Sequence, residues 1–128
     1  MMADIFEDFE TYFTAQGLLD ETPLQFDGFQ TVPDKAVAIM EYEGASAPMQ
    51  VTGTYRSFQL VVRDKSVLGA RTRAHAFYRS LYVPMGILNL TEERWIQLVL
   101  KQPPFKLKID EAGRTYYCFN FGANTFID

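Results

Sequence analysis

Two segments of the chain repeat apolar residues at helical spacing. The first is flanked by Asp4, a good N-cap, and by Gly17, which can close a helix in a left-handed conformation. Its apolar residues recur every three or four positions: Ile5, Phe6, Phe9, Tyr12 and Phe13. The pattern predicts an amphipathic helix over residues 4–16.

The second helical pattern follows Ser66, another N-cap residue, and stops before Pro84, which cannot continue a helix. Its apolar stripe consists of Val67, Ala70, Ala74, Phe77 and Leu81. These signals predict a second helix over residues 67–82 that packs on a sheet.

Strands are predicted wherever apolar and polar residues alternate with a period of two. The expected strands are 24–26, 35–42, 54–63, 86–90, 95–100, 105–109 and 114–121. Pro103 and Pro104 are expected to end the strand that starts at Trp95, and Asp110–Gly113 suits a hairpin turn. The order helix, strands, helix, strands does not fit a regular βαβ parallel sheet. It predicts an α+β fold, a mainly antiparallel β-sheet packed by two α-helices, in a single domain over residues 1–128.

Two segments carry features that a simple sheet does not explain. The segment Glu43–Gly53 is rich in small residues, so we expect a mobile connection in which Met49 and Val51 are the anchors for a partner. The last strand has bulky apolar residues on both of its faces, from Tyr116 to Phe126. Either other elements cover both faces, or one face is an association surface.

Composition narrows the possible functions. The 128 residues are 48% hydrophobic and rich in aromatic side chains, as expected of a chain that folds. A net charge of −4 excludes the basic footprint of a nucleic-acid reader, although DNA could pass nearby without being gripped. With one cysteine and neither a signal peptide nor a long apolar run, we expect folding in a reducing cytoplasm and neither secretion nor membrane insertion.

No catalytic, metal or cofactor site is predicted. His75 lies with Arg71 and Arg79 at successive i+4 positions, where a solvated helix face and a contact surface for a neighbouring subunit are the two readings. Cys118 lies among aromatic residues of a strand, which favours a buried structural thiol over a nucleophile. Glu7 and Asp8 stand where acidic side chains complement a helix N-terminus, so they require no metal.

Taken in order, these elements resemble the phage minor capsid or tail-completion family, whose members look like the tail terminators of long non-contractile tails. The points of similarity are the opening helix to Gly17, the strands 36–45 and 58–65, the helix from Ala70 to Leu81, the segment 102–105, and the hairpin 110–114 that leads into 117–121. The similarity extends over nearly the whole chain and rests on order and spacing.

The resemblance implies a structural subunit of the virion that forms a ring, typically a hexamer, at the head-proximal end of the tail. Its implied partners are copies of itself, the tail-tube protein and the head connector protein, and DNA would pass through the ring without sequence-specific binding. From the residues alone, we predict contacts at Met49, Val51, Arg71, His75, Tyr78, Arg79, Phe121 and Phe126.

Two other functions stay open at this point. One is a different head–tail part, such as a stopper or adaptor. The other is a ligand-binding or regulatory module with an aromatic pocket around Trp95 and Tyr117.

Overall fold

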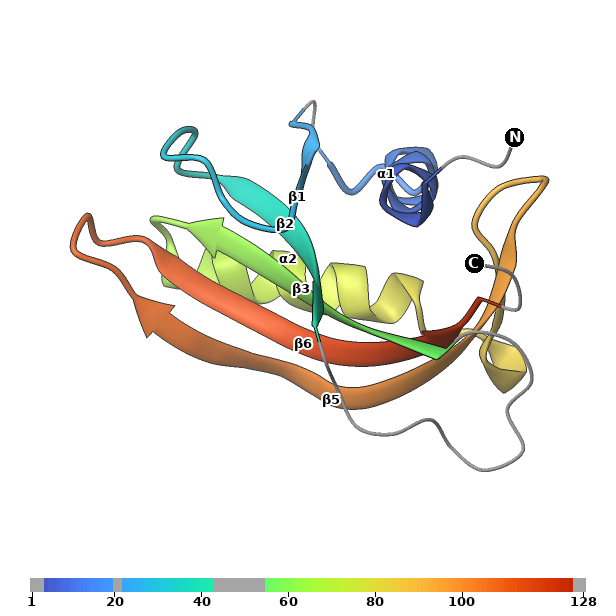
Figure 1. Ribbon diagram of the computed structural model, residues 1–128. Helices are drawn as coiled ribbons and strands as arrows, with labels where there is room; N and C mark the ends of the chain where they lie inside the picture. The colour runs from blue at the N-terminus through green and yellow to red at the C-terminus, as the bar shows by residue number, and fades with distance from the viewer. Residues whose placement is uncertain (1–3, 20–21, 43–54, 126–128) are drawn as a thin grey trace.

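The computed structural model describes residues 4–19, 22–42 and 55–125. In this part of the chain, two helices pack against one curled sheet of six strands, in the order β1-β2-β3-β6-β5-β4 (Figure 1). The elements are α1 (Ile5–Ala15), β1 (Leu24–Phe26), β2 (Ala36–Tyr42), β3 (Tyr55–Asp64), α2 (Val67–Ser80), the short 3-10 helix η1 (Pro84–Gly86), β4 (Ile87–Asn89), β5 (Trp95–Ile109) and β6 (Thr115–Asn124). The predicted α+β fold with two helices is confirmed.

Both helices begin at the residues that the sequence indicates. The Asp4 carboxylate accepts a hydrogen bond from the Phe6 N–H at 2.8 Å, and the Ser66 hydroxyl accepts one from the Gly69 N–H at 2.9 Å. Each bond satisfies a backbone donor that has no partner within its helix. Gly17 follows α1 with a φ of +72°, as predicted for the residue that ends it.

The core lies between the helices and one face of the sheet, which we call the helix face. Phe9 of α1 meets Phe58 of β3 and Phe121 of β6 edge-on, with ring centroids 5.4 and 5.7 Å apart. Phe13 and Phe77 join the two helices at 4.9 Å. The Tyr12 hydroxyl also donates to the Ser80 carbonyl at 2.5 Å, which fixes α1 against the end of α2.

The opposite face of the sheet is partly covered by the connection between β1 and β2. Phe29 from this connection packs with Met40, Val61, Tyr116, Cys118 and Phe105 in a second, smaller cluster. The guanidinium of Arg63 lies 4.5 Å from the Phe29 ring centroid and donates to the carbonyls of Pro33 and Asp34. Of the two explanations for the two-sided aromatic strand, coverage on both faces therefore holds for the middle of β6.

The sheet is mainly antiparallel, as predicted. β1 and β2 pair in parallel, with Gln25 opposite Ala38, whereas the other neighbouring strands pair antiparallel. The prediction that Pro103 and Pro104 end a strand is wrong, because β5 runs unbroken from Trp95 to Ile109. β4 pairs only with residues 95–97. Beyond that point no other described strand pairs with this side of β5, and a residue without an N–H is tolerated there. Register shifts on either side of Gln102 absorb the irregularity.

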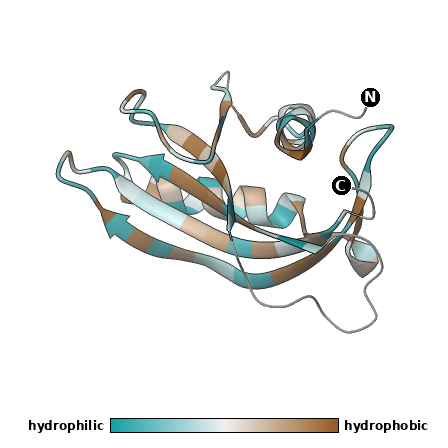
Figure 2. Ribbon diagram, viewed as in Figure 1, coloured by the Kyte–Doolittle hydropathy of each residue, from teal (hydrophilic) through white to brown (hydrophobic). Residues whose placement is uncertain are grey.

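Hydropathy follows this pairing (Figure 2). Brown and teal segments alternate along β5, whose inward residues Ile96 and Leu98 are buried while Gln97 is exposed. The turn at Asp110–Gly113 joins β5 to β6 as predicted, with a φ of +80° at Gly113. The segment Glu43–Gly53, predicted to be mobile, lies outside the described residues.

Candidate functional site: contact surfaces of the subunit

The described residues form no chemical centre around the two side chains considered for catalysis. Cys118 is fully buried, and burial raises the pKa of its thiol to about 11. The Gln59 amide lies 3.6 Å from its sulfur and is the hydrogen-bonding neighbour of that thiol. A protonated, inaccessible thiol in a packed strand fits a structural role.

Among residues 4–19, 22–42 and 55–125, no three His, Cys, Asp or Glu side chains gather closely enough to hold a metal ion. Asp8, predicted to serve the helix N-terminus, has a further role. Its carboxylate pairs with the Arg94 guanidinium at 2.5 Å, and both side chains are almost fully buried. The pair fastens α1 to the turn between β4 and β5. No local sequence pattern predicts this contact, because the two residues are 86 positions apart.

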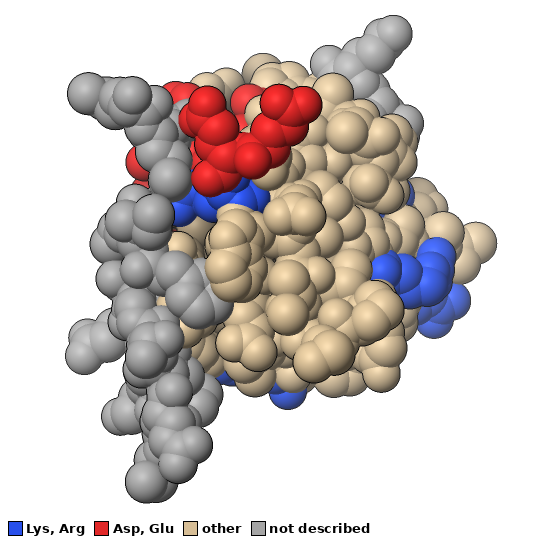
Figure 3. Space-filling model, turned by 90° about the vertical axis from the view of Figure 1, so that its right-hand side faces the viewer, with Lys and Arg blue, Asp and Glu red and all other residues tan. Residues whose placement is uncertain are grey.

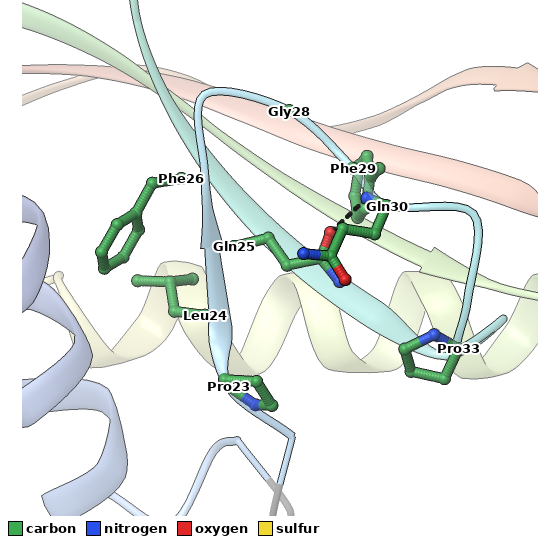
Figure 4. Close-up of a pocket in the computed structure, with 8 residues that line it drawn as sticks. All are labelled: Pro23, Leu24, Gln25, Phe26, Gly28, Phe29, Gln30 and Pro33. Carbon is green, nitrogen blue, oxygen red and sulfur yellow. Dashed lines mark hydrogen bonds between the residues drawn. The ribbon is translucent and has the colours of Figure 1, made fainter.

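One hollow lies beside β1 (Figure 4). It has a volume of about 490 Å³ and is lined by Pro23, Leu24, Gln25, Phe26, Gly28, Phe29, Gln30 and Pro33. The Gln25 side chain crosses it and accepts a hydrogen bond from the Gln30 N–H at 2.6 Å. Its lining contains no titratable side chain, so it offers no acid, base or nucleophile.

The aromatic pocket considered around Trp95 and Tyr117 does not form. Trp95 lies on the same face of β5 as Gln97, two positions later, and Gln97 pairs with Asn124, so Trp95 and Asn124 share a face of the sheet. Tyr117 is separated from Asn124 by an odd number of positions along β6, and its side chain therefore points to the other face. Trp95 is half exposed, whereas Tyr117 belongs to the core.

The predicted contact residues other than Phe121 divide into three groups. Arg71 and Arg79 are exposed, and His75 is half-buried between them on the outer side of α2. Tyr78 turns inward, with its ring 5.3 Å from that of Phe119. Met49, Val51 and Phe126 lie outside the described residues.

Phe121 requires a correction. It is fully buried and stacks on Phe58 with ring centroids 5.5 Å apart. Its side chain is part of the core, so it is not available for a contact with a partner. The alternation of β6 identifies two faces but does not say which one the helices cover.

The edges of the sheet offer limited room for another strand. β1 has three residues, and the Leu24 N–H is taken by the Glu10 carboxylate at 2.9 Å. β4 is equally short, and β5 contains two prolines, which donate no hydrogen bond. Association through side-chain surfaces is therefore favoured over strand addition in the described part of the chain.

In the described part of the chain, a small helix-covered sheet with short edge strands and exposed side-chain surfaces is consistent with a structural subunit. The model of the bacteriophage tail terminator protein family matches residues 12–126. The chain belongs to this family, and the suspected resemblance is confirmed. It is thus a structural protein of phage tails. A comparison with curated proteins finds no match. Neither described helix has the length and apolar character needed to cross a membrane.

Proposed function

We propose that this chain forms a ring of six subunits at the head-proximal end of the phage tail. The ring ends polymerisation of the tail tube, joins the tail to the head connector protein, and lets DNA pass. The observation that carries this proposal is membership of the tail terminator family over nearly the whole chain.

The geometry is consistent with a subunit whose contacts close into a ring. Open sheet edges template further strands, and the short strands β1 and β4 and the two prolines of β5 make such addition less favourable here. Contacts between side-chain surfaces can close into a ring when each subunit presents two different patches. The polar outer side of α2, with Arg71, His75 and Arg79, is proposed to lie within such a contact.

The acidic character of the chain is consistent with passage of DNA. A net charge of −4 gives no overall attraction for a polyanion, so DNA can move past the subunit without being held. Folding would take place in the host cytoplasm before incorporation into the virion.

The experiment compares particles made with and without this protein. In its absence, tail tubes should grow beyond the normal length and fail to join heads, as measured by negative-stain electron microscopy. Addition of purified protein should restore the normal length and produce a cap at one end.

A different outcome would favour the alternative head–tail part. Tubes of normal length that do not join heads would indicate a stopper or adaptor. Normal particles made without the protein would contradict both functions.

A further inference from the structure

The two helices of the subunit carry charges of opposite sign. The 14 residues of α2 include three arginines and one histidine and no acidic residue. α1 and its N-cap contain no basic residue and four acidic ones: Asp4, Glu7, Asp8 and Glu10. The difference extends along the chain, because the first 34 residues have a net charge of −8 and the rest has one of +4. Charges that are segregated in this way favour binding of one region to its opposite in another molecule.

The first charged region, which we call the acidic surface, joins the start of α1 to the turn between β4 and β5. It consists of four exposed carboxylates: Asp4, Glu7, Glu92 and Glu93. Helix and turn lie side by side, since together they line one hollow of about 460 Å³ with Asp8, Thr11, Thr91, Glu92 and Glu93. Its described lining contains no basic residue. Figure 3 shows acidic side chains gathered at the top of the subunit, with one basic patch directly below them and other Lys and Arg side chains at the lower and right-hand edges.

The second charged region, which we call the basic surface, is the outer side of α2. Arg71, His75 and Arg79 follow one another at intervals of four residues and form a stripe about 12 Å long. Arg71 and Arg79 are exposed, and His75 between them is half-buried. The other side of the helix packs in the core through Ala74 and Phe77. The stripe therefore faces away from the sheet.

The charges of the two surfaces have no counter-ion within the described part of the subunit. Other charged side chains form ion pairs: Glu41 with Arg56, Asp34 with Lys65, and Asp110 with Arg114. Arg94, the basic residue next to the β4–β5 turn, is buried and pairs with Asp8. Among the residues that the structure describes, no ion pair includes a carboxylate of the acidic surface or an exposed arginine of the basic surface.

Two exposed lysines of β5 belong to neither surface. Lys101 donates to the Ser57 hydroxyl at 3.2 Å, and the Lys108 ammonium lies 4.7 Å from the Tyr116 ring centroid. Tyr116 is part of the second cluster, and Ser57 pairs with Gly122, an even number of positions from Tyr116 along β6. Both lysines therefore contact the face of the sheet opposite the helices.

We propose that the basic surface of one copy binds the acidic surface of the next copy. This inference rests on the proposed function, because it identifies the two surfaces that close the ring. Two basic surfaces repel each other, and so do two acidic ones, so the contact joins unlike surfaces, as a heterologous ring requires. The hollow beside Glu92 and Glu93 has room for an arginine side chain of the stripe, and a carboxylate binds a guanidinium through charge-assisted hydrogen bonds.

Charge reversal on either surface tests this contact. Arg71→Glu with Arg79→Glu makes the stripe acidic, and Glu92→Arg with Glu93→Arg makes the turn basic. All four side chains are exposed and outside the ion pairs of the subunit, so both double variants should fold, as circular dichroism would show. Should the acidic stripe unfold α2, Arg71→Gln with Arg79→Gln takes its place.

The matched control is Lys101→Glu with Lys108→Glu. It changes the net charge by the same amount as the reversal of the stripe, but on the opposite face of the sheet. A fourth chain combines Arg71→Glu, Arg79→Glu, Glu92→Arg and Glu93→Arg. In this chain the stripe and the turn have exchanged signs, so the attraction between neighbouring copies is restored.

Self-association is measured by analytical ultracentrifugation and mass photometry, with and without purified tail tubes. Association of wild type should weaken as ionic strength rises from about 0.01 to 1 M, because the Debye length falls from about 30 to 3 Å. Each double variant of the proposed contact should associate more than about 10-fold more weakly than wild type. The lysine control should assemble like wild type, and the chain with exchanged signs should recover assembly.

The outcomes separate this inference from the proposed function. Double variants that assemble like wild type, association that is insensitive to salt, or no recovery on exchange of signs would refute the assigned surfaces and leave the ring intact. An equal loss in the lysine control would show that net charge alone is responsible and would also refute them. Retardation of double-stranded DNA by wild type, abolished by reversal of the stripe, would assign the stripe to DNA instead. A wild type that neither self-associates nor caps tubes would overturn both proposals.

Discussion

The buried pair Asp8–Arg94 should determine whether α1 stays on the sheet. We propose the substitution Asp8→Ala, which leaves the Arg94 guanidinium in place with a side chain only 3% exposed. The carboxylate that lies 2.5 Å from it is then gone. α1 should detach or water should enter beneath it, because removal of the carboxylate from a buried ion pair is strongly unfavourable.

The expected loss is large relative to the stability of a domain. Removal of one partner from a buried ion pair costs about 3–5 kcal/mol, compared with a total of about 5–15 kcal/mol for a domain. Loss of a first-turn carboxylate from a helix adds at most about 1 kcal/mol. The melting temperature should fall by roughly 10–20 °C.

Two further variants make this prediction specific. Asp8→Leu combined with Arg94→Met should recover most of the stability, because apolar packing can replace a buried ion pair. Lys65→Met removes the exposed pair with Asp34, whose side chains are 63% and 46% exposed, and should cost less than about 1 kcal/mol.

Urea denaturation and differential scanning calorimetry measure all three variants. A loss below about 1 kcal/mol for Asp8→Ala would show that solvent already reaches Arg94. If the double variant is as unstable as Asp8→Ala, apolar side chains cannot replace the ion pair at this position, which would contradict the prediction.

Three other predictions concern the hairpin, the thiol and the turn before β4. Loss of water contact alone would raise the pKa of Asp110, but hydrogen bonds from Arg114 and the Tyr116 hydroxyl lower it to about 2. This stabilisation is fully present above the pKa of Asp110 in the unfolded chain and is lost as pH falls through the folded-state pKa. The melting temperature of wild type should therefore fall between about pH 4 and 2 by an amount that is missing in Asp110→Asn. Cys118 should react with a thiol reagent at pH 8 only as fast as the protein unfolds, and Cys118→Ala should cost about 1–3 kcal/mol in urea denaturation; rapid labelling of the native protein would contradict its burial. Gly86→Ala should destabilise by more than about 1 kcal/mol, because its Cβ would lie 2.5 Å from the Leu98 carbonyl oxygen at a φ of +71°; an unchanged melting temperature would contradict this packing.

Local chemistry allowed the helices and the last turn to be predicted from the sequence. Ser66 and Asp4 cap the helices because their side chains reach backbone donors within three residues. Gly113 accepts the left-handed backbone of the β5–β6 turn for a similarly local reason. The family resemblance depends on the order of these elements, and the family comparison confirms it.

Surface exposure was much less predictable. The alternation along β6 separates its residues into two faces, but the positions of α1 and α2 decide which face is buried. Phe121 therefore belongs to the core, while Arg71 and Arg79 of α2 are exposed. The contact surface predicted from the sequence therefore loses Phe121, whereas Arg71 and Arg79 on the outer side of α2 stay exposed.

Only the tertiary structure decided the pairings between distant segments. Pro103 and Pro104 stay within β5 because that strand has an open edge there, and whether an edge is open depends on the shortness of β4. Asp8 meets Arg94 because the β4–β5 turn folds over the start of α1. The sequence by itself determined caps, turns and periodicity, since these depend on neighbours within a few residues. Strand order and burial depend on contacts across the whole fold, which no local pattern contains.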